Sequence, residues 1–549
     1  MSSVCKSCGG AFSIDSADQG FYARISVPAP SCCPECRLQR KLAHHNQMTL
    51  FRRSCDATGE SLISHFPPDS PYKVYAQKLW WSDAFDGCEY GRPFDFNKTF
   101  FDQYQELSLT VPRVALMTDY LRDENCSYTN FSGRNKNCYL IFDSDESWDC
   151  YYSYTINGSR SCLECFRVKS MELCCEASDS KDSYGSAFIY NCDNCRDSFF
   201  LESCIGCKNC ILCCNLRQKE YYIRNRPASR EEFEALRKTL SSWQQLQKLL
   251  TEFEKMVSRF PRRALRGFHN ENVSGDYLVH CKDAQNCYDC LELRDGKYCY
   301  QGFMALKDCM DCEECGEGEL LYECSNLGYN AYNCRFSHQS LSQISNLTYC
   351  DHCFNGCSDL FGCISLRRKK HCVLNQQYTE SEYNTLVPRI IEHMRGTGEW
   401  GEFFPMQLSP FPYNISMAQD QFPLSREQAA GLGLSWYEGE TRGSKPATFS
   451  LPPNVAETPE SVCQELLNCE RCGKNYKLIP QELAFYKSIG LALPRSCFQC
   501  RHAARFARRN PRKLHERFCE RCGKSLQSTF STEQADIVYC ENCFSESME

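Results

Sequence analysis

Residues 137–162 read NCYLIFDSDESWDCYYSYTINGSRSC, and in and around this stretch a cysteine recurs every twelve residues. The cysteines of this series are Cys126, Cys138, Cys150, Cys162 and Cys174. A fixed period is typical of stacked structural units, because equal spacing puts one residue type at the same place in each unit. Cysteine is small and often fully buried, so a column of thiols suits the interior of such a stack.

The residues between these cysteines predict short strands and tight turns. Residues 139–142 (YLIF) and 151–154 (YYSY) are mostly aromatic or aliphatic, as in strands, whereas Asn157-Gly158 and Asp143-Ser144 are turn formers. We therefore expect a β-solenoid over residues 125–226. Known coils have about 20 residues or more, so we expect twelve residues to make roughly half a coil.

A second copy of this region follows further along the chain. The segment CCNLRQK at 213–219 returns as CISLRRK at 363–369, and the NCY at 137–139 returns at 286–288. These matches predict a second β-solenoid over residues 269–376.

Both copies lead into a predicted helix. Ser229 and Glu232 have the spacing of a capping box, as do Thr379 and Glu382. Apolar residues then follow a three-four spacing from Phe233 to Phe260, which predicts one long amphipathic helix that ends at Pro261. Its apolar stripe is expected to pack on the solenoid, and a homodimer seam is the alternative.

Pairs of cysteines in CxxC spacing occur at both ends of the chain. Two such pairs about 25 residues apart have the spacing of a four-thiolate zinc site, since each pair presents two sulfurs to one tetrahedral metal. The alternative for these cysteines is a set of buried free thiols. The predicted ligands, grouped by site, are Cys5, Cys8, Cys33 and Cys36; Cys469, Cys472, Cys497 and Cys500; and Cys519, Cys522, Cys540 and Cys543.

The first two of these modules share further residues. Each has CxxCG, a Phe-Tyr pair (Phe21-Tyr22 and Phe485-Tyr486), a proline and CxxCR. In this pattern the modules resemble the zinc-ribbon, treble-clef-like domain family, and the resemblance implies that their eight cysteines are zinc ligands. The whole chain also resembles a group of uncharacterised bacterial Cys-rich proteins, which share residues 80–83 (WWSD), the repeat region and residues 409–414 (SPFPYN).

The third site needs a choice of pairing, which the N-terminal module provides. Cys55 follows Cys36 by the same interval as Cys519 follows Cys500, but Thr58 stands where Cys522 would have its match. The N-terminal site must then close with its first two pairs alone. We therefore pair the C-terminal cysteines in sequence order, which gives about three zinc ions per chain.

Composition favours a reducing compartment and gives no sign of a membrane segment. The chain has 549 residues, 44 cysteines and a net charge of -7. No apolar signal segment follows Met1, and no apolar run of about 18 residues is present. We therefore expect a cytoplasmic protein that does not contact membranes, in which cysteines are metal ligands or buried thiols.

A basic run follows the second zinc-ribbon module and is compatible with a helix. Such a cluster could neutralise phosphates, which makes nucleic acid or the ribosome a candidate partner. The alternative is a solvated helix face that keeps the module soluble. The residues expected to contact nucleic acid are Arg501, Arg505, Arg508, Arg509, Arg512 and Lys513.

Two other functions were weighed. Cys204, Cys207, Cys210 and Cys214 have the spacing of a ferredoxin cluster loop, which would indicate an iron-sulfur or thiol redox protein, but Asn215 replaces the usual proline. A glycan-active β-helix enzyme would need convergent carboxylates. The tight acidic cluster of the first copy, at residues 143–146, lies in a turn-like stretch and is better explained as solvated.

The sequence thus predicts a mostly β protein: a duplicated Cys-rich β-solenoid with inserted α-helices, flanked by small zinc-ribbon or treble-clef modules. We expect a non-enzymatic binding or scaffold protein whose ribbons contact nucleic acid, the ribosome or a protein partner. The predicted segments are 1–60 (zinc ribbon), 61–124 (aromatic cap over the first repeat), 125–226 (solenoid copy 1), 227–268 (amphipathic helix), 269–376 (solenoid copy 2), 377–400 (helix), 401–460 (linker), 461–517 (zinc ribbon with basic helix) and 518–549 (C-terminal zinc ribbon).

Overall fold

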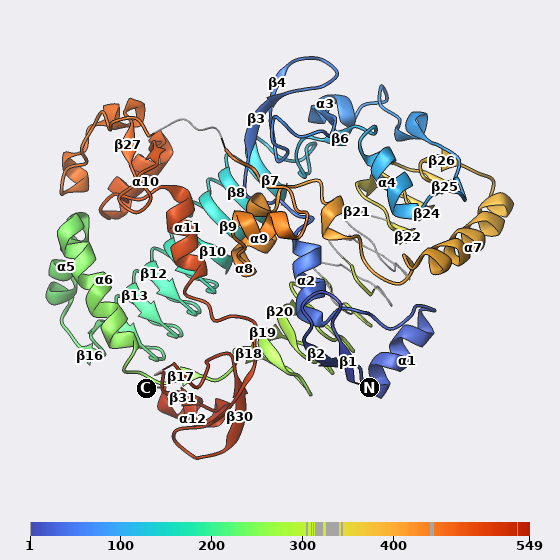
Figure 1. Ribbon diagram of the computed structural model, residues 1–549. Helices are drawn as coiled ribbons and strands as arrows, with labels where there is room; N and C mark the ends of the chain where they lie inside the picture. The colour runs from blue at the N-terminus through green and yellow to red at the C-terminus, as the bar shows by residue number, and fades with distance from the viewer. Residues whose placement is uncertain are drawn as a thin grey trace. The chain divides into compact units, whose positions relative to one another are not determined.

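The computed structural model describes residues 2–303, 306–308, 310, 312, 322–324, 340–341, 344–439, 444–534 and 536–548 (Figure 1). The chain divides into two compact units, each built from two separate segments. Unit 1 contains Met1–Leu116 and Leu265–Tyr437, and unit 2 contains Met117–Ala264 and Glu438–Glu549. The C-terminal modules therefore belong with the first repeat region, and the N-terminal modules belong with the second.

Unit 2 contains a ten-stranded sheet, the first ladder, whose strands follow one another in chain order (Figure 1). All neighbouring strands are parallel except the last pair. The strands are β7 (Tyr128–Gly133), β8 (Tyr139–Asp145), β9 (Tyr151–Asn157), β10 (Phe166–Lys169), β11 (Cys175–Ser178), β12 (Ala187–Tyr190), β13 (Phe199–Glu202), β14 (Ile211–Cys214), β15 (Tyr222–Ile223) and β16 (Arg226–Pro227).

The register of the first ladder is twelve residues. Tyr154 pairs with Phe166, Ala187 with Phe199 and Phe199 with Ile211. Bridges outside the strands keep the same interval, for example from Trp148 to Arg160 and on to Glu172. Because the chain returns to the same place after twelve residues, each twelve-residue rung is complete. The expectation that twelve residues form half a coil was wrong.

The backbone of the first ladder turns at every third residue. Asn137, Leu140, Asp143, Glu146 and Asp149 all have a left-handed φ, between 49° and 54°. A left-handed conformation costs a residue other than glycine roughly 1–2 kcal/mol, and asparagine and aspartate tolerate it best. These corners make a rung short enough to close in twelve residues.

The residue after each corner points into the interior, and it is often a cysteine or a serine. Cys138, Ile141, Ser147 and Cys150 are at most 3 % exposed. The thiol of Cys138 donates to the carbonyl of Lys136, two residues earlier (3.3 Å), and the hydroxyl of Ser147 donates to the carbonyl of Asp145 (3.1 Å). Cysteine and serine thus make the same contact: each donates a second hydrogen bond to a carbonyl that also accepts from a backbone amide of the next rung, that of Asp149 or Gly158.

Unit 1 holds the second ladder, in which neighbouring strands pair mainly in parallel at intervals of eleven to thirteen residues. Gly275 pairs with Cys287, and Ser345 with Ser358. Thiols again fill the interior, with Cys287, Cys290 and Cys299 at most 2 % exposed. The strands are β18 (Gly267–Phe268), β19 (Gly275–Val279), β20 (Cys287–Leu291), β21 (Ser340–Leu341), β22 (Ser345–Thr348), β23 (Cys353–Phe354), β24 (Ser358–Phe361), β25 (Lys370–Val373) and β26 (Gln376–Gln377).

Helices follow each ladder, and their capping boxes were predicted correctly. Ser229 and Glu232 cap α5 (Arg230–Lys238), and Thr379 and Glu382 cap α7 (Glu380–Thr397). The single long helix expected up to Phe260 is broken, however, by a 3-10 turn at Thr239–Ser241 before α6 (Trp243–Val257). At the break, the amide of Trp243 donates to the carbonyl of Pro453 (2.8 Å), outside the helix.

The aromatic segment after the N-terminal module packs on the second ladder. The rings of Trp80 and Phe354 lie 5.5 Å apart, and those of Phe100 and Phe361 lie 5.4 Å apart. This segment was expected to cover the start of the first repeat. Its aromatic residues pack on the second repeat instead, whereas Met117 and Asp119, near its end, bond to Ser132 of β7 in the first. Its helices are α3 (Gln77–Trp80), the 3-10 turn η1 (Gly87–Tyr90) and α4 (Phe100–Ser108).

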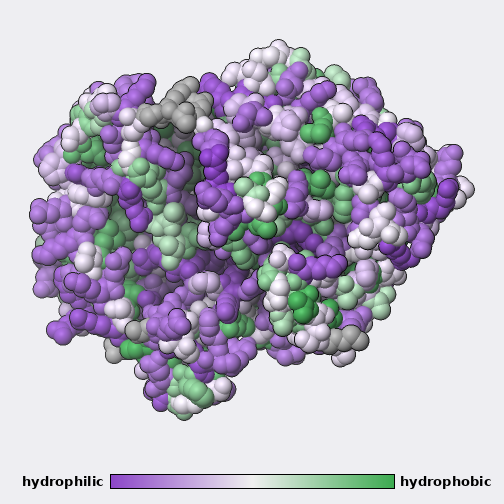
Figure 2. Space-filling view, in the orientation of Figure 1, coloured by the Kyte–Doolittle hydropathy of each residue, from purple (hydrophilic) through white to green (hydrophobic). Residues whose placement is uncertain are grey.

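The segment predicted to be a linker has more structure than expected. The predicted short helix is present as α9 (Arg426–Gly431), capped by Ser425 and Gln428. It is preceded by α8 (Met417–Gln421), and Phe403, Phe404 and Phe411 are at most 2 % exposed. These rings join the core of unit 1. The face of the molecule in Figure 2 is mainly hydrophilic, with hydrophobic residues in scattered patches.

Unit 1 also buries several histidines around a buried ion pair. Arg113 contacts Asp351, and both side chains are 1 % exposed. Asp351 also contacts Nδ1 of His352 (2.6 Å), whose ring lies 6.4 Å from that of His65. Burial lowers the pKa of His44 to about 4 and that of His45 to about 3. His44 and His45 are therefore neutral in the folded protein at neutral pH.

We expect the two histidines to make unit 1 sensitive to mild acid. An unfolded histidine has a pKa of about 6.5, so below that pH the unfolded chain binds protons that the folded chain does not. The contribution of the two histidines to the free energy of unfolding is fully present above pH 6.5. Below that pH it falls by roughly 1.4 kcal/mol per pH unit for each histidine, down to about pH 4. Urea unfolding at pH 7, 6 and 5 measures this slope. His44→Phe, which keeps the ring packing against Phe403, should give a shallower slope, and an unchanged slope would contradict the assignment.

The interior hydrogen bonds of the first ladder predict a second effect. The hydroxyl of Ser153 accepts from the amide of Cys165 (3.0 Å) and donates to the carbonyl of Tyr151 (3.0 Å). Ser153→Ala leaves the buried amide of Cys165 without this acceptor, whereas the carbonyl of Tyr151 still accepts from the amide of Glu164 (3.1 Å). The lost hydrogen bond should cost about 1–3 kcal/mol. Denaturant unfolding followed by circular dichroism checks this. The exposed Ser258→Ala is the control and should change stability by at most about 0.5 kcal/mol.

Candidate metal centres

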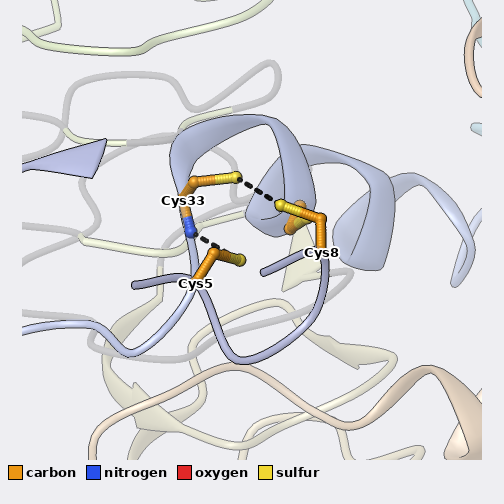
Figure 3. Close-up of side chains that lie close together, drawn as sticks. Cys5, Cys8 and Cys33 are labelled. Carbon is orange, nitrogen blue, oxygen red and sulfur yellow. Dashed lines mark hydrogen bonds between the residues drawn. The ribbon is translucent and has the colours of Figure 1, made fainter. Parts of the chain in front are cut away.

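The first four-cysteine group lies in the N-terminal module (Figure 3). A hairpin of β1 (Ser2–Val4) and β2 (Ala11–Ser13) presents Cys5 and Cys8, and the start of α2 (Pro34–Leu42) presents Cys33 and Cys36. The amide of Cys5 donates to the carbonyl of Gly10, and the amide of Gly9 donates to the carbonyl of Cys5 (both 2.9 Å). Gly9 has a φ of 71°, which favours glycine at this turn. Helix α1 (Ser16–Arg24) lies between the two cysteine pairs.

The sulfurs of this group are positioned as metal ligands. They all lie within 4.8 Å of one another, and the Sγ atoms of Cys8 and Cys33 are 3.9 Å apart. The amide of Cys33 donates to Sγ of Cys5 (3.3 Å). Although burial acts to raise it, backbone amides, that of Cys33 foremost, lower the pKa of the Cys5 thiol to about 6. The thiolate is the form that binds a metal.

The second group, in the C-terminal part of unit 2, has the same construction. A hairpin of β27 (Leu467–Asn468) and β28 (Asn475–Tyr476) presents Cys469 and Cys472. After α10 (Pro480–Ile489), the chain presents Cys497 and Cys500 at the start of α11 (Phe498–Phe506). The Sγ atoms of Cys472 and Cys497 lie 3.7 Å apart, and all four sulfurs lie within 4.8 Å of one another.

The third group contains Cys519, Cys522, Cys540 and Cys543, so the cysteines pair in sequence order as predicted. A hairpin of β29 (His515–Phe518) and β30 (Ser525–Ser528) presents the first pair, and α12 (Glu541–Ser547) carries Cys543. Strand β31 (Val538–Tyr539) leads into the second pair and aligns in parallel with β17 (Arg262–Arg263). The Sγ atoms of Cys522 and Cys540 are 3.8 Å apart.

The sulfur spacing fits a tetrahedral metal with four thiolates. Zinc–sulfur bonds of about 2.3 Å at tetrahedral angles put neighbouring sulfurs about 3.8 Å apart. The three sulfur–sulfur distances given above lie between 3.7 and 3.9 Å. Each group could therefore hold a zinc-like ion with little rearrangement. All twelve residues predicted from CxxC spacing belong to these groups.

A fourth hairpin repeats this geometry without its ligands. It consists of β3 (Phe51–Ser54) and β4 (Ser61–Ser64), and the amide of Cys55 donates to the carbonyl of Glu60 (2.8 Å). The amide of Ala76 donates to Sγ of Cys55 (3.4 Å), just as that of Cys540 donates to Sγ of Cys519 (3.3 Å). Strand β5 (Val74–Tyr75) aligns in parallel with β6 (Arg113–Val114).

The sequence shows which residues replace the metal-binding cysteines in this hairpin. A constant offset of 464 residues relates Cys519 to Cys55, Cys522 to Thr58 and Cys540 to Ala76. From the sequence we identified the lost ligand position at Thr58 but not the one at Ala76. The constant offset of 464 residues indicates both positions.

The alternative cysteine site of the first ladder is not assembled. Among the residues that the structure describes, Cys204, Cys207, Cys210 and Cys214 do not belong to any group of three or more close ligand atoms. The thiol of Cys204 donates to the carbonyl of Glu202 (3.5 Å), and that of Cys210 to the carbonyl of Lys208 (3.2 Å). The described cysteines are all free of disulfide bonds. These thiols therefore serve the interior of the ladder.

The acidic cluster of the first ladder is engaged in surface pairs. Arg134 contacts Asp145 and also Glu146 (3.0 Å). The hydroxyl of Thr155 donates to Asp143 (2.6 Å). These contacts do not give the facing pair of carboxylates that glycoside hydrolysis requires.

The basic helix α11 has its first two arginines buried. Arg501 is 8 % exposed and lies 2.9 Å from both Glu164 and Glu482. Arg505 is 3 % exposed and contacts Glu164 (2.5 Å) and Glu176 (3.1 Å). Burial removes both guanidinium groups from any surface that a phosphate could reach in this structure, against the expectation for these two residues.

The remaining basic residues divide between contacts and surface. Arg508 lies over the ring of Tyr190, 3.7 Å from its centre, and Arg509 is 3.4 Å from Asp179. Arg509 and Arg512 are partly buried, and Arg508 and Lys513 are exposed. The predicted basic surface is thus smaller than expected, because its two buried arginines face the first ladder.

Truncating Arg505 should strongly destabilise unit 2. Burial raises the pKa of Glu164, and Arg501 and Arg505 oppose that rise. Arg505→Met leaves the buried carboxylate with one cation fewer, which should cost about 3–5 kcal/mol. Denaturant unfolding measures the loss. Lys513→Met, at the exposed end of the same basic run, is the control, and equal effects of the two changes would contradict the ion-pair assignment.

Comparisons with known proteins do not assign the chain to a family. A scan against protein-family models finds no match, and a search of curated proteins finds no significant match either. Within the described part of the chain, no helix has the length and apolar character needed to cross a bilayer.

Proposed function

We propose that this protein is a non-enzymatic, zinc-binding scaffold. The observation that carries this proposal is the arrangement of twelve cysteines in three groups, each with the sulfur spacing of a tetrahedral metal site. Four thiolates without a free coordination position are typical of structural zinc sites, whereas catalytic sites keep one position open.

We further propose that the two ladders are β-solenoids whose rungs have four sides of three residues. The twelve-residue register and the left-handed corner at every third residue support this arrangement. A stack of this kind has a dry interior of thiols, which a reducing cytoplasm would keep from forming disulfides. We therefore propose a cytoplasmic location.

A protein partner is the better supported candidate among those considered. Arg501 and Arg505, which nucleic acid or the ribosome would need, are buried against carboxylates. Lys513 and the other exposed residues of the ribbons leave a smaller basic surface than the sequence suggested. We propose that the ribbons and the ladders present surfaces to another protein.

Metal analysis of single-site variants tests the zinc proposal. The purified, reduced protein should contain three zinc ions per chain. Cys472→Ser removes one ligand of the second group and should lower the content to two, because three thiolates bind zinc less tightly than four. Cys463→Ser changes a nearby cysteine outside the groups and should leave three. Zinc content is measured by elemental mass spectrometry, and a protein free of metal after expression and refolding with zinc would sink the proposal.

A further inference from the structure

Helix α11 lies along one face of the first ladder (Figure 1), where it contacts aromatic and acidic side chains. Ring contacts run along the ladder from one rung to the next. Phe498 stacks on Phe142, whereas His502 meets Tyr154 and Phe166 edge to face, as Phe506 meets Phe166. Further on, Arg508 lies over Tyr190. Phe142, Tyr154, Phe166 and Tyr190 occupy the same position in their rungs, since they are separated by twelve residues or a multiple of twelve. The helix therefore runs along the stacking direction.

The charges of the two surfaces repeat at matching intervals. Glu164 and Glu176 occupy equivalent positions in successive rungs, which are about 4.8 Å apart. Arg501 and Arg505 lie one helical turn apart, a rise of about 5.4 Å to 6 Å. Arg505 bridges both carboxylates, at 2.5 and 3.1 Å, and Arg501 reaches Glu164 at 2.9 Å. A helix with arginines at positions i and i+4 thus fits this face because turn and rung have similar spacing.

The second metal site holds α11 at this face. Cys497 is the N-cap of α11 and Cys500 lies in its first turn, so two of the four ligands of the site belong to the helix. The helix has nine residues. Helices shorter than about 12–15 residues are marginal by themselves in water, so a metal that fixes the first turn should favour the docked helix.

We propose that this face of the first ladder is a docking surface for arginine-bearing helices, and that metal at the second site keeps α11 in it. When the metal leaves, α11 is released and the face accepts a basic helix from a partner protein. The proposal rests on the zinc binding proposed above.

A peptide competition with the full-length protein tests the docking surface. The probe is a fluorescent peptide of residues 498–512 with Cys500→Ser, and its binding is followed by anisotropy under reducing conditions. The double variant Cys497→Ser/Cys500→Ser should bind the peptide at least tenfold more tightly than the zinc-loaded protein. Adding Glu164→Gln and Glu176→Gln should remove this gain, as should a peptide with Arg501 and Arg505 replaced by Gln.

A matched control removes two ligands from a different metal site. Cys519→Ser/Cys522→Ser removes the third site and leaves α11 in place, so its peptide binding should equal that of the intact protein. Equal binding by the two double variants would overturn the role of the second site. Failure of the Cys497→Ser/Cys500→Ser protein to bind the peptide, once α11 is shown to be released, would overturn the docking surface.

Hydrogen exchange shows whether α11 is released, and it also guards against global unfolding. In the Cys497→Ser/Cys500→Ser protein, amides of residues 498–506 should lose protection, while those of β13 and β14 should keep it. The wild-type protein treated with a zinc chelator should show the same local loss. A variant that loses one zinc ion but keeps α11 protected would overturn the proposal that metal holds the helix, without affecting the proposal of zinc binding. A protein that binds no zinc would overturn both proposals.

Discussion

The structure depends on a left-handed corner at every third residue of the ladders. Each corner turns backbone groups towards the interior, where they must find hydrogen-bond partners within a very narrow space. Small polar side chains fit this space: Ser153 accepts from the amide of Cys165, and Cys138 and Ser147 add a second hydrogen bond to the carbonyls two residues before them. Cysteine suits these interior positions because it is small and a weak donor. In the part of the chain that the structure describes, only cysteines of the terminal modules are grouped closely enough to hold a metal.

The cysteine spacing predicted more of the structure in the terminal modules than in the ladders. In the terminal modules, each CxxC pair is a local hairpin or helix start, so spacing identified the twelve cysteines of the three groups, and the comparison with the N-terminal module gave their grouping. In the ladders, the twelve-residue interval was visible, but the three-residue step was not. Leu140, Tyr152 and Phe200 occupy left-handed corners although none of them is a turn former. The length of the rung was therefore overestimated.

Contacts between distant segments could not be foreseen in the same way. The basic run after Cys500 has the composition of a nucleic-acid-binding helix, and no local feature indicates that Glu164 and Glu176 receive its arginines. Likewise, the break before Trp243 depends on Pro453, which lies far along the chain. Local rules gave the capping boxes and the ligands, whereas tertiary contacts decided which side chains stayed exposed.

The mixed register of the second ladder has a consequence for how such a stack can change. Ser345 pairs with Ser358 across thirteen residues, and Ser358 pairs with Lys370 across twelve, so one extra residue is stored between them. Consecutive left-handed residues occur there, at Asn355 and Gly356. A single inserted residue can thus be accommodated where two consecutive residues, one of them glycine, adopt the left-handed conformation. A duplication of twelve residues adds one complete rung. An insertion of five or seven residues elsewhere would move polar side chains into the buried interior and apolar side chains out of it. We therefore expect this architecture to evolve by the gain or loss of whole twelve-residue rungs.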